Sequence, residues 1–127
     1  EGIPATIRKE LVTDMTDSFY PMKPVVPYIK VTQDRVVLEI QRGCIRGCRF
    51  CQAGQLYRPV RERDVEVLKK YAMEMLKNTG HEEISLSSLS SSDYSKLPEL
   101  LAAFPNKYQI KRYEGKGGAT IIAYKCL

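Results

Sequence analysis

Three of the chain's four cysteines lie within eight residues, at Cys44, Cys48 and Cys51, and this cluster constrains the chain more than any other feature. Disulfides are a poor interpretation, because so short a loop gains little from a cross-link and three thiols cannot pair evenly. Thiolates are the usual ligands of iron–sulfur clusters, and short spacings let one loop wrap such a cluster. With three protein ligands, a four-iron cluster keeps one iron open, as a catalytic zinc keeps one open position. The spacing therefore predicts a reactive metal–sulfur centre.

The residues around the cysteines carry a more specific resemblance. The spacing Cys-x3-Cys-x2-Cys, with Phe50 just before the last cysteine, resembles the signature of the radical S-adenosylmethionine superfamily. The longer strings Arg42-Gly-Cys-Ile-Arg-Gly-Cys-Arg-Phe-Cys-Gln-Ala-Gly54 and Tyr57-Arg-Pro-Val-Arg-Glu-Arg63 resemble a narrower subgroup of bacterial radical enzymes. Members of that subgroup commonly carry a cobalamin-binding-type domain ahead of the barrel. The resemblance covers roughly residues 18–100 and is strongest between 35 and 63.

This resemblance implies an enzyme of the oxidoreductase or transferase type. A 4Fe–4S cluster on the three cysteines would bind S-adenosyl-L-methionine through its amino and carboxylate groups. An electron from the cluster would cleave that cofactor reductively to methionine and a 5′-deoxyadenosyl radical, which abstracts hydrogen from a substrate that the sequence does not name. The resemblance also implies an electron donor such as flavodoxin or ferredoxin, and cobalamin if the upstream domain exists. Whether this part of the chain is active alone stays open.

A second group of candidate residues follows from the same resemblance. In the superfamily, the end of the second barrel strand typically contacts the amino group of S-adenosylmethionine, often through a Gly-Gly-Glu-like element. This chain offers a serine-rich stretch at residues 86–93 instead. The role therefore carries over only loosely, to Ser87, Ser88 and Asp93, because a hydroxyl or carboxylate accepts from an ammonium group. Phe50 completes the cofactor-binding candidates. The alternative is that the serines are plain loop and cap residues.

The order of elements predicts an α/β fold and, by resemblance, part of a (β/α) TIM-type barrel. Two β-branched segments at 28–32 and 35–41 predict a hairpin before the cysteines. Asp64 as N-cap and Gly80 after the last turn delimit a helix with one apolar stripe. A strand at 83–89 then completes a right-handed parallel unit.

After this unit the pattern becomes less typical of a barrel. Ser95 is expected to cap a further helix. Strand-like segments at 107–113 and 119–125 predict a hairpin, whose turn at 114–118 lacks the spacing of a phosphate-binding loop.

Ahead of the first strand, apolar residues at a spacing of four within residues 1–12 predict a short helix, and three prolines in residues 20–27 predict an extended linker. We expect residues 1–27 to be a lead-in and residues 28–127 to be the first part of an incomplete barrel. Because the chain begins at Glu1, it is expected to belong to something longer. It has neither a signal segment nor an apolar run of about 18 residues, so the sequence predicts a soluble cytoplasmic protein without membrane contact.

Two other functions stay open at this stage. A structural zinc site would recruit His81 or Cys126 as fourth ligand, although zinc ligands usually come as two separated pairs. An RNA-binding surface would use the arginines near the cysteines, in a chain of net charge +5. The same arginines are also expected to offset the negative charge of a thiolate-ligated cluster. They are Arg42, Arg46, Arg49, Arg58, Arg61 and Arg63.

Overall fold

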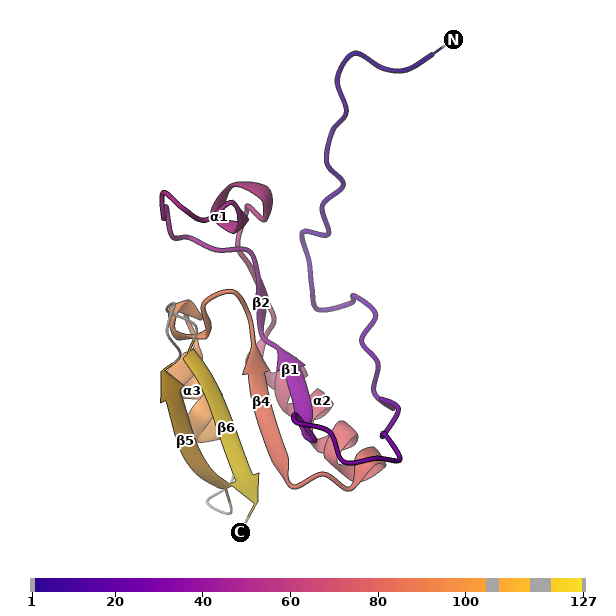
Figure 1. The fold of residues 1–127 in the computed structure, drawn as a ribbon, viewed down its shortest axis with the longest axis vertical. Coiled ribbons are helices and arrows are strands. Elements are labelled where there is room, and N and C mark those ends of the chain that lie inside the picture. Colours follow the sequence, from indigo (N-terminus) through magenta and orange to yellow (C-terminus); the bar gives the residue numbers. More distant parts are fainter. Residues whose placement is uncertain (1, 105–107, 115–119, 127) are drawn as a thin grey trace.

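The computed structural model describes the backbone of residues 2–104, 108–114 and 120–126, and the side chains of residues 2–104. A four-stranded sheet in the order β1-β4-β6-β5 lies at its centre, with helices on one face (Figure 1). Its strands are β1 (Val36–Glu39), β4 (Glu83–Ser87), β5 (Tyr108–Glu114) and β6 (Thr120–Cys126). A separate ribbon pairs β2 (Gln41–Arg42) with β3 (Arg61–Glu62). The helical elements are α1 (Ala53–Leu56), α2 (Val65–Thr79), the 3-10 turn η1 (Ser91–Asp93) and α3 (Leu97–Ala103).

The predicted strand, helix and strand form the parallel pair at the heart of the sheet. β1 and β4 run parallel, with Val36 beside Ile84 and Leu38 beside Leu86. Val36 and Leu38 are buried while Val37 between them is exposed, as alternation along a half-buried strand requires. The buried side chains therefore point to the face that the helices cover, and the opposite face of β1 and β4 carries polar groups.

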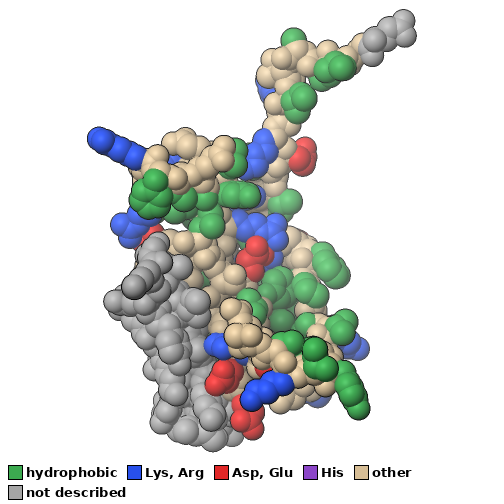
Figure 2. All heavy atoms as spheres, viewed as in Figure 1, with side chains coloured by type: hydrophobic (Ala, Val, Ile, Leu, Met, Phe, Trp, Pro, Cys, Tyr) green, Lys and Arg blue, Asp and Glu red, His purple; other side chains and the backbone are tan. Residues whose placement is uncertain are grey.

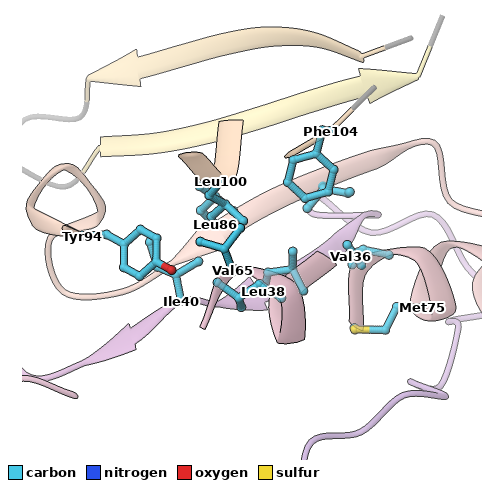
Figure 3. Packing of buried hydrophobic residues seen from close by; sticks show 12 residues of the cluster. Val36, Leu38, Ile40, Val65, Met75, Leu86, Tyr94, Leu100 and Phe104 are labelled. Atoms are coloured by element: carbon cyan, nitrogen blue, oxygen red, sulfur yellow. The ribbon is translucent and has the colours of Figure 1, made fainter. Parts of the chain in front are cut away.

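Helix α2 begins and ends where the sequence predicts. The Asp64 side chain accepts a hydrogen bond from the amide of Glu66 at 3.0 Å, which satisfies one of the free amides of the first turn. Gly80 ends the helix with a φ of 73°, the left-handed conformation that favours glycine. The apolar stripe of α2 enters the core with β1, β4 and α3 (Figure 3). The core consists of Val36, Leu38, Ile40, Val65, Leu68, Ala72, Met75, Ile84, Leu86, Tyr94, Leu100 and Phe104.

The predicted hairpin before β1 is wrong, because residues 28–32 form no strand and are exposed. The side chain of Tyr20 occupies the free edge of β1 instead. Its hydroxyl donates to the carbonyl of Val37 at 2.7 Å and accepts from the amide of Glu39 at 3.0 Å. These are the backbone groups that a pairing strand would satisfy. The Tyr20 ring also stacks on Tyr71 of α2, with centroids 5.0 Å apart.

Two smaller expectations about helices are also wrong. The first residues form no helix and extend away from the rest of the molecule (Figure 2). Ile3 and Ile7 are almost fully exposed, so the apolar spacing there has no surface to pack on. Ser95 does not cap α3, whose N-cap residue is Lys96 without a side-chain hydrogen bond. The Ser95 hydroxyl donates instead to the carboxylate of Glu62 and caps no amide of the first turn of α3.

The predicted C-terminal hairpin is confirmed by the backbone pairing of β5 with β6, while its turn lies outside the described residues. β6 then pairs antiparallel with β4, where a barrel would place another parallel strand. The described residues therefore form a mixed α/β sheet with a single parallel pair, and they close no barrel. None of the helices in the described part of the chain has the length and apolarity that crossing a lipid bilayer requires.

Candidate metal centre

The cysteine loop (residues 43–52) lies at the edge of the sheet where its parallel strands end. Along the chain, β1 leads through the short strand β2 into the cysteine loop, and β4 leads into the serine-rich stretch. Because β1 and β4 are parallel, both segments leave the sheet at the same edge (Figure 1). Ligand sites in sheets with parallel strands form at this carboxyl edge.

Two glycines hold the base of the cysteine loop together. Gly43 has a φ of 95°, and a side chain there would collide with the backbone oxygens of Tyr57 and Pro59. A side chain at Gly54 would collide with the carbonyl oxygen of Arg46. The loop therefore folds back on the segment that follows it through close backbone contacts. Gly54 ends the motif string in the sequence, three residues after the last cysteine, but this close contact with Arg46 was not predicted from it.

The three thiols are free and accessible. Cys44 and Cys51 are half-buried, Cys48 is exposed, and none of them forms a disulfide. The amide of Cys51 donates to the carbonyl of Cys48 at 3.1 Å, and the amide of Arg46 donates to the Cys44 Sγ at 3.4 Å. Among the described residues, however, no three histidine, cysteine or acidic side chains gather closely enough to hold a metal ion. The donor set fits an iron–sulfur cluster, and the thiols must converge to bind it.

The fourth ligands of the zinc hypothesis lie at the other edge of the sheet. His81 precedes β4, and its Nδ1 lies 3.7 Å from Asp34 Oδ1. Cys126 follows Lys125, which pairs with Glu83 at the start of β4. The length of β4, at about 3.3 Å a residue, separates this edge from the cysteine loop. The structure therefore argues against a zinc site completed by either residue.

The predicted cofactor-binding residues do not form one cluster. Ser87 and Ser88 line a cavity of about 460 Å³ beside Gly43, and the Ser88 hydroxyl lies 3.0 Å from that of Ser91. Phe50 is 91% exposed at the tip of the cysteine loop. Asp93 forms an ion pair with Arg46. A second cavity, of about 270 Å³, is lined by Cys44, Ile45, Arg58, Pro59 and Val60.

Arg46 joins the cysteine loop to the segment after β4. Its Nε and Nη2 donate to the two carboxylate oxygens of Asp93 at 2.9 and 2.6 Å. The hydrogen bond from Arg46 lowers the pKa of the Asp93 carboxyl below its usual value, so the pair stays charged. Sequence reasoning missed this pair, although both residues follow strands that end at the same edge. The Asp93 carboxylate therefore binds the cysteine loop through Arg46 and does not line the cavity of about 460 Å³.

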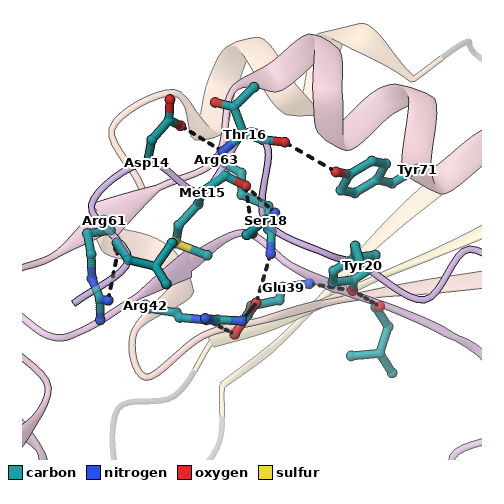
Figure 4. Close-up of polar contacts among 12 residues, drawn as sticks. Asp14, Met15, Thr16, Ser18, Tyr20, Glu39, Arg42, Arg61, Arg63 and Tyr71 are labelled. Atoms are coloured by element: carbon teal, nitrogen blue, oxygen red, sulfur yellow. Dashed lines mark hydrogen bonds and ion pairs between the residues drawn. The ribbon is translucent and has the colours of Figure 1, made fainter. Parts of the chain in front are cut away.

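Arg42 and Arg63 form an arginine cluster around Glu39, next to the start of the cysteine loop (Figure 4). The fully buried Arg63 donates to the Glu39 carboxylate at 3.2 Å and to the carbonyl of Met15. Arg42 forms two further bonds to Glu39, at 2.8 and 2.9 Å. Partial burial would raise the pKa of the Glu39 carboxyl, but these hydrogen bonds outweigh it and hold the pKa below its usual value. Arg63 also lies over the ring of Tyr20, 5.0 Å from its centroid.

These contacts bear on the RNA hypothesis as well. Three of the arginines near the cysteines, Arg42, Arg46 and Arg63, are engaged with carboxylates. Engaged guanidinium groups are poor phosphate ligands, because a phosphate would have to displace the carboxylate. The structure therefore favours the interpretation that these arginines organise the protein around the cysteine loop.

Comparison with known proteins decides the family. The sequence model of the radical SAM superfamily matches residues 38–122, which include all three clustered cysteines and most of the sheet. The chain belongs to the radical SAM superfamily. The match is to the superfamily as a whole and does not reach the cobalamin-associated subgroup. Superfamily membership implies a 4Fe–4S cluster and S-adenosylmethionine, together with a partial TIM-barrel-like α/β fold.

A relative in Methanocaldococcus jannaschii is similar to this radical SAM chain. It is 34% identical over 101 residues, which cover 72% of this chain and 23% of the relative, and it is described only as an uncharacterised protein. The chain thus spans less than a quarter of the length of the curated relative that it matches. No solved structure matches the chain significantly.

Proposed function

We propose that the protein is a radical SAM enzyme whose cluster is held by the thiolates of Cys44, Cys48 and Cys51. The thiolates of Cys44, Cys48 and Cys51 would hold a 4Fe–4S cluster, which would supply the one-electron chemistry for reductive cleavage of S-adenosylmethionine and radical abstraction of hydrogen from the substrate. One observation carries the proposal: three free thiols at the family's spacing lie on one loop at the carboxyl edge of a parallel strand pair.

The surrounding residues have roles that the contacts support. Arg46 and Asp93 fix the cysteine loop against the segment after β4, and so limit the positions that the thiols take up. Ser87 and Ser88 line the cavity of about 460 Å³ next to the loop, where their hydroxyls can accept from the amino group of S-adenosylmethionine. Phe50 is exposed beside Cys51, free to cover a bound cofactor with its ring.

The remaining parts of the function belong to the whole protein. An electron donor of the flavodoxin or ferredoxin type and a reducing cytoplasmic compartment suit a chain with free clustered thiols. A cobalamin-binding domain upstream of this chain stays a prediction from the resemblance.

The proposal is tested by product analysis after anaerobic reconstitution with iron and sulfide. The full-length protein is incubated with S-adenosylmethionine and a strong reductant, and 5′-deoxyadenosine is measured. We expect a brown protein that forms 5′-deoxyadenosine, because reductive cleavage of the sulfonium releases that nucleoside after hydrogen abstraction.

The test variant Cys48→Ala and its control Arg49→Lys change neighbouring exposed residues of the same loop. Cys48→Ala removes a cluster ligand and should abolish colour and product together. Arg49→Lys keeps the positive charge beside the cluster and should retain both. A colourless wild-type protein that binds stoichiometric zinc, or a Cys48→Ala protein that still makes product, would contradict the proposal.

A further inference from the structure

The cavity next to the cysteine loop has the size and position of a ligand site. It measures about 460 Å³, within the range of small-molecule pockets. Glu39 and Ser87, which line it, are register partners and alternate with the buried Leu38 and Leu86, so the cavity opens on the face of β1 and β4 opposite the helices. Its other lining residues are Gln41, Arg42, Gly43, Tyr57, Arg61, Ser88 and Leu89.

Two arginines of this cavity stand directly opposite each other. Arg42 of β2 and Arg61 of β3 are register partners, so their side chains leave the ribbon on the same face. Like charges in this position destabilise a pair of strands. The carboxylate that lines the cavity, Glu39, is already occupied by two bonds from Arg42 and one from Arg63. The cavity therefore carries an excess of positive charge.

Arg61 is the cation that this arrangement leaves without a counter-charge. Its guanidinium donates only to backbone carbonyls, those of Pro59 and Val12, each at 3.2 Å. No carboxylate among the described residues reaches it. An arginine held by neutral carbonyls keeps further donors for a planar oxyanion, which guanidinium groups bind with two parallel hydrogen bonds.

The side-chain oxygen of Gln41, which is buried without a hydrogen-bond partner among the described residues, is independent evidence for a ligand site. Gln41 is 3% exposed, and its Nε2 donates to the carbonyl of Ser90 at 2.7 Å, while its Oε1 has no hydrogen-bond partner. A buried acceptor without a donor is costly. A ligand that carries both a hydrogen-bond donor and an anionic group would match this cavity.

We propose that the cavity binds the carboxylate or phosphate group of a reactant, with Arg61 as its principal cationic partner. The inference rests on the proposed function and deepens it, because the cavity adjoins the candidate metal centre. Two reactants of a radical SAM enzyme can bring such a group: the substrate, and S-adenosylmethionine through its methionyl carboxylate.

The test measures anion binding and cofactor binding separately. Inorganic phosphate, acetate and S-adenosylmethionine are titrated into the reconstituted full-length protein by calorimetry at low ionic strength. Arg61→Gln should weaken binding of phosphate or acetate by about tenfold to a hundredfold, the usual loss for a charge-assisted hydrogen bond. Arg61→Lys should keep part of the affinity. Arg8→Gln, which removes the same charge from the exposed lead-in, should change nothing.

The source of the anion follows from the third titration. If Arg61→Gln leaves S-adenosylmethionine binding unchanged, the cavity serves the substrate, and if that binding falls by the same factor, the cavity serves the methionyl carboxylate. Equal anion affinity in wild type and Arg61→Gln would overturn the inference. Thermal unfolding and iron content of each variant show whether the fold and the cluster are intact. Formation of 5′-deoxyadenosine by a protein that fails the anion test would leave the proposed function standing.

Discussion

The cysteine loop and the arginine cluster beneath it lie close together and are held in opposite ways. Arg63 is fully buried among a carboxylate, a backbone carbonyl and the rings of Tyr20 and Tyr71. In the cysteine loop, Ile45 is 61% and Phe50 91% exposed. The protein therefore buries the arginine at the sheet edge with its own side chains, while the tip of the loop above it stays exposed and its thiols remain free for a bound group.

This difference has an energetic meaning. Packing and hydrogen bonds form the scaffold without any cofactor, because its apolar core and the contacts of Arg63 to Glu39 and Met15 are made by the protein alone. The thiols have not converged, so binding of the cluster must supply the free energy that draws them together. A folded scaffold with an adaptable loop lets the protein exist before the cluster is inserted.

The largest effect is expected at Arg63. Arg63→Ala removes two hydrogen-bonded contacts, two cation–π contacts and a buried side chain, so the free energy of unfolding should fall by about 4 kcal/mol. Urea unfolding followed by circular dichroism measures the change. Arg8→Ala in the exposed lead-in is the control and should fall within about 0.5 kcal/mol of wild type. A loss under about 1 kcal/mol at Arg63 would refute its role as an anchor.

The next largest effect is expected from truncating an aliphatic residue of the core, compared with one of the cysteine loop. Leu38→Ala, at a position with no exposure, should lower the free energy of unfolding by about 3 kcal/mol. Ile45→Ala in the cysteine loop should lower it by less than about 0.5 kcal/mol. Both are measured by urea unfolding of the iron-free protein. Similar losses at the two positions would show that the loop is packed as tightly as the core.

How far the sequence predicts the molecule depends on how local each signal is. Helix α2 was predictable because Asp64 and Gly80 mark its ends within the element itself. The role of Tyr20 was not predictable, because its hydroxyl bonds to the backbone of Val37 and Glu39, which lie 17 and 19 positions further along the chain, and takes the place of a pairing strand. The burial of Arg63 depends on Met15, 48 positions away. Such contacts leave no periodic pattern in the sequence.

The candidate site shows the same distinction. The cysteines were predictable because their spacing itself carries the chemistry of a cluster. The ion pair of Arg46 with Asp93 requires knowing that β1 and β4 end at one edge. Of the candidates in the serine-rich stretch, Ser87 and Ser88 line the cavity at this edge, while Asp93 forms an ion pair with Arg46 instead.

A moderate effect is expected from pH. The pKa of the Glu39 carboxyl in the folded protein lies below its usual value of 4.5. At a pH between these two pKa values, the carboxyl binds a proton in the unfolded chain and not in the folded chain. The contribution of Glu39 to stability is therefore complete above pH 4.5 and is lost as the pH falls through the lower pKa of the folded state. Unfolding curves of wild type and Glu39→Gln between pH 7 and about 3 measure it. Equal acid slopes in the two proteins would contradict this reasoning.

The smallest effect on stability is expected at Arg46. Its side chain is 59% exposed, so Arg46→Ala should leave the urea midpoint of unfolding close to that of wild type. It should nevertheless speed amide hydrogen exchange in residues 44–51, because the ion pair to Asp93 is lost. Arg49→Ala is the control within the same loop. Unchanged exchange in Arg46→Ala would mean that the ion pair does not hold the loop.

The central claim is that three thiolates leave one iron of the cluster open for S-adenosylmethionine. Electron paramagnetic resonance of the reduced, reconstituted protein, with and without S-adenosylmethionine, tests it most directly, because a new ligand on iron changes the resonance. The account predicts a cluster signal that shifts in a saturable way with S-adenosylmethionine and is absent from Cys48→Ala. A signal that S-adenosylmethionine does not alter, as a cluster with a fourth protein ligand would give, would contradict it.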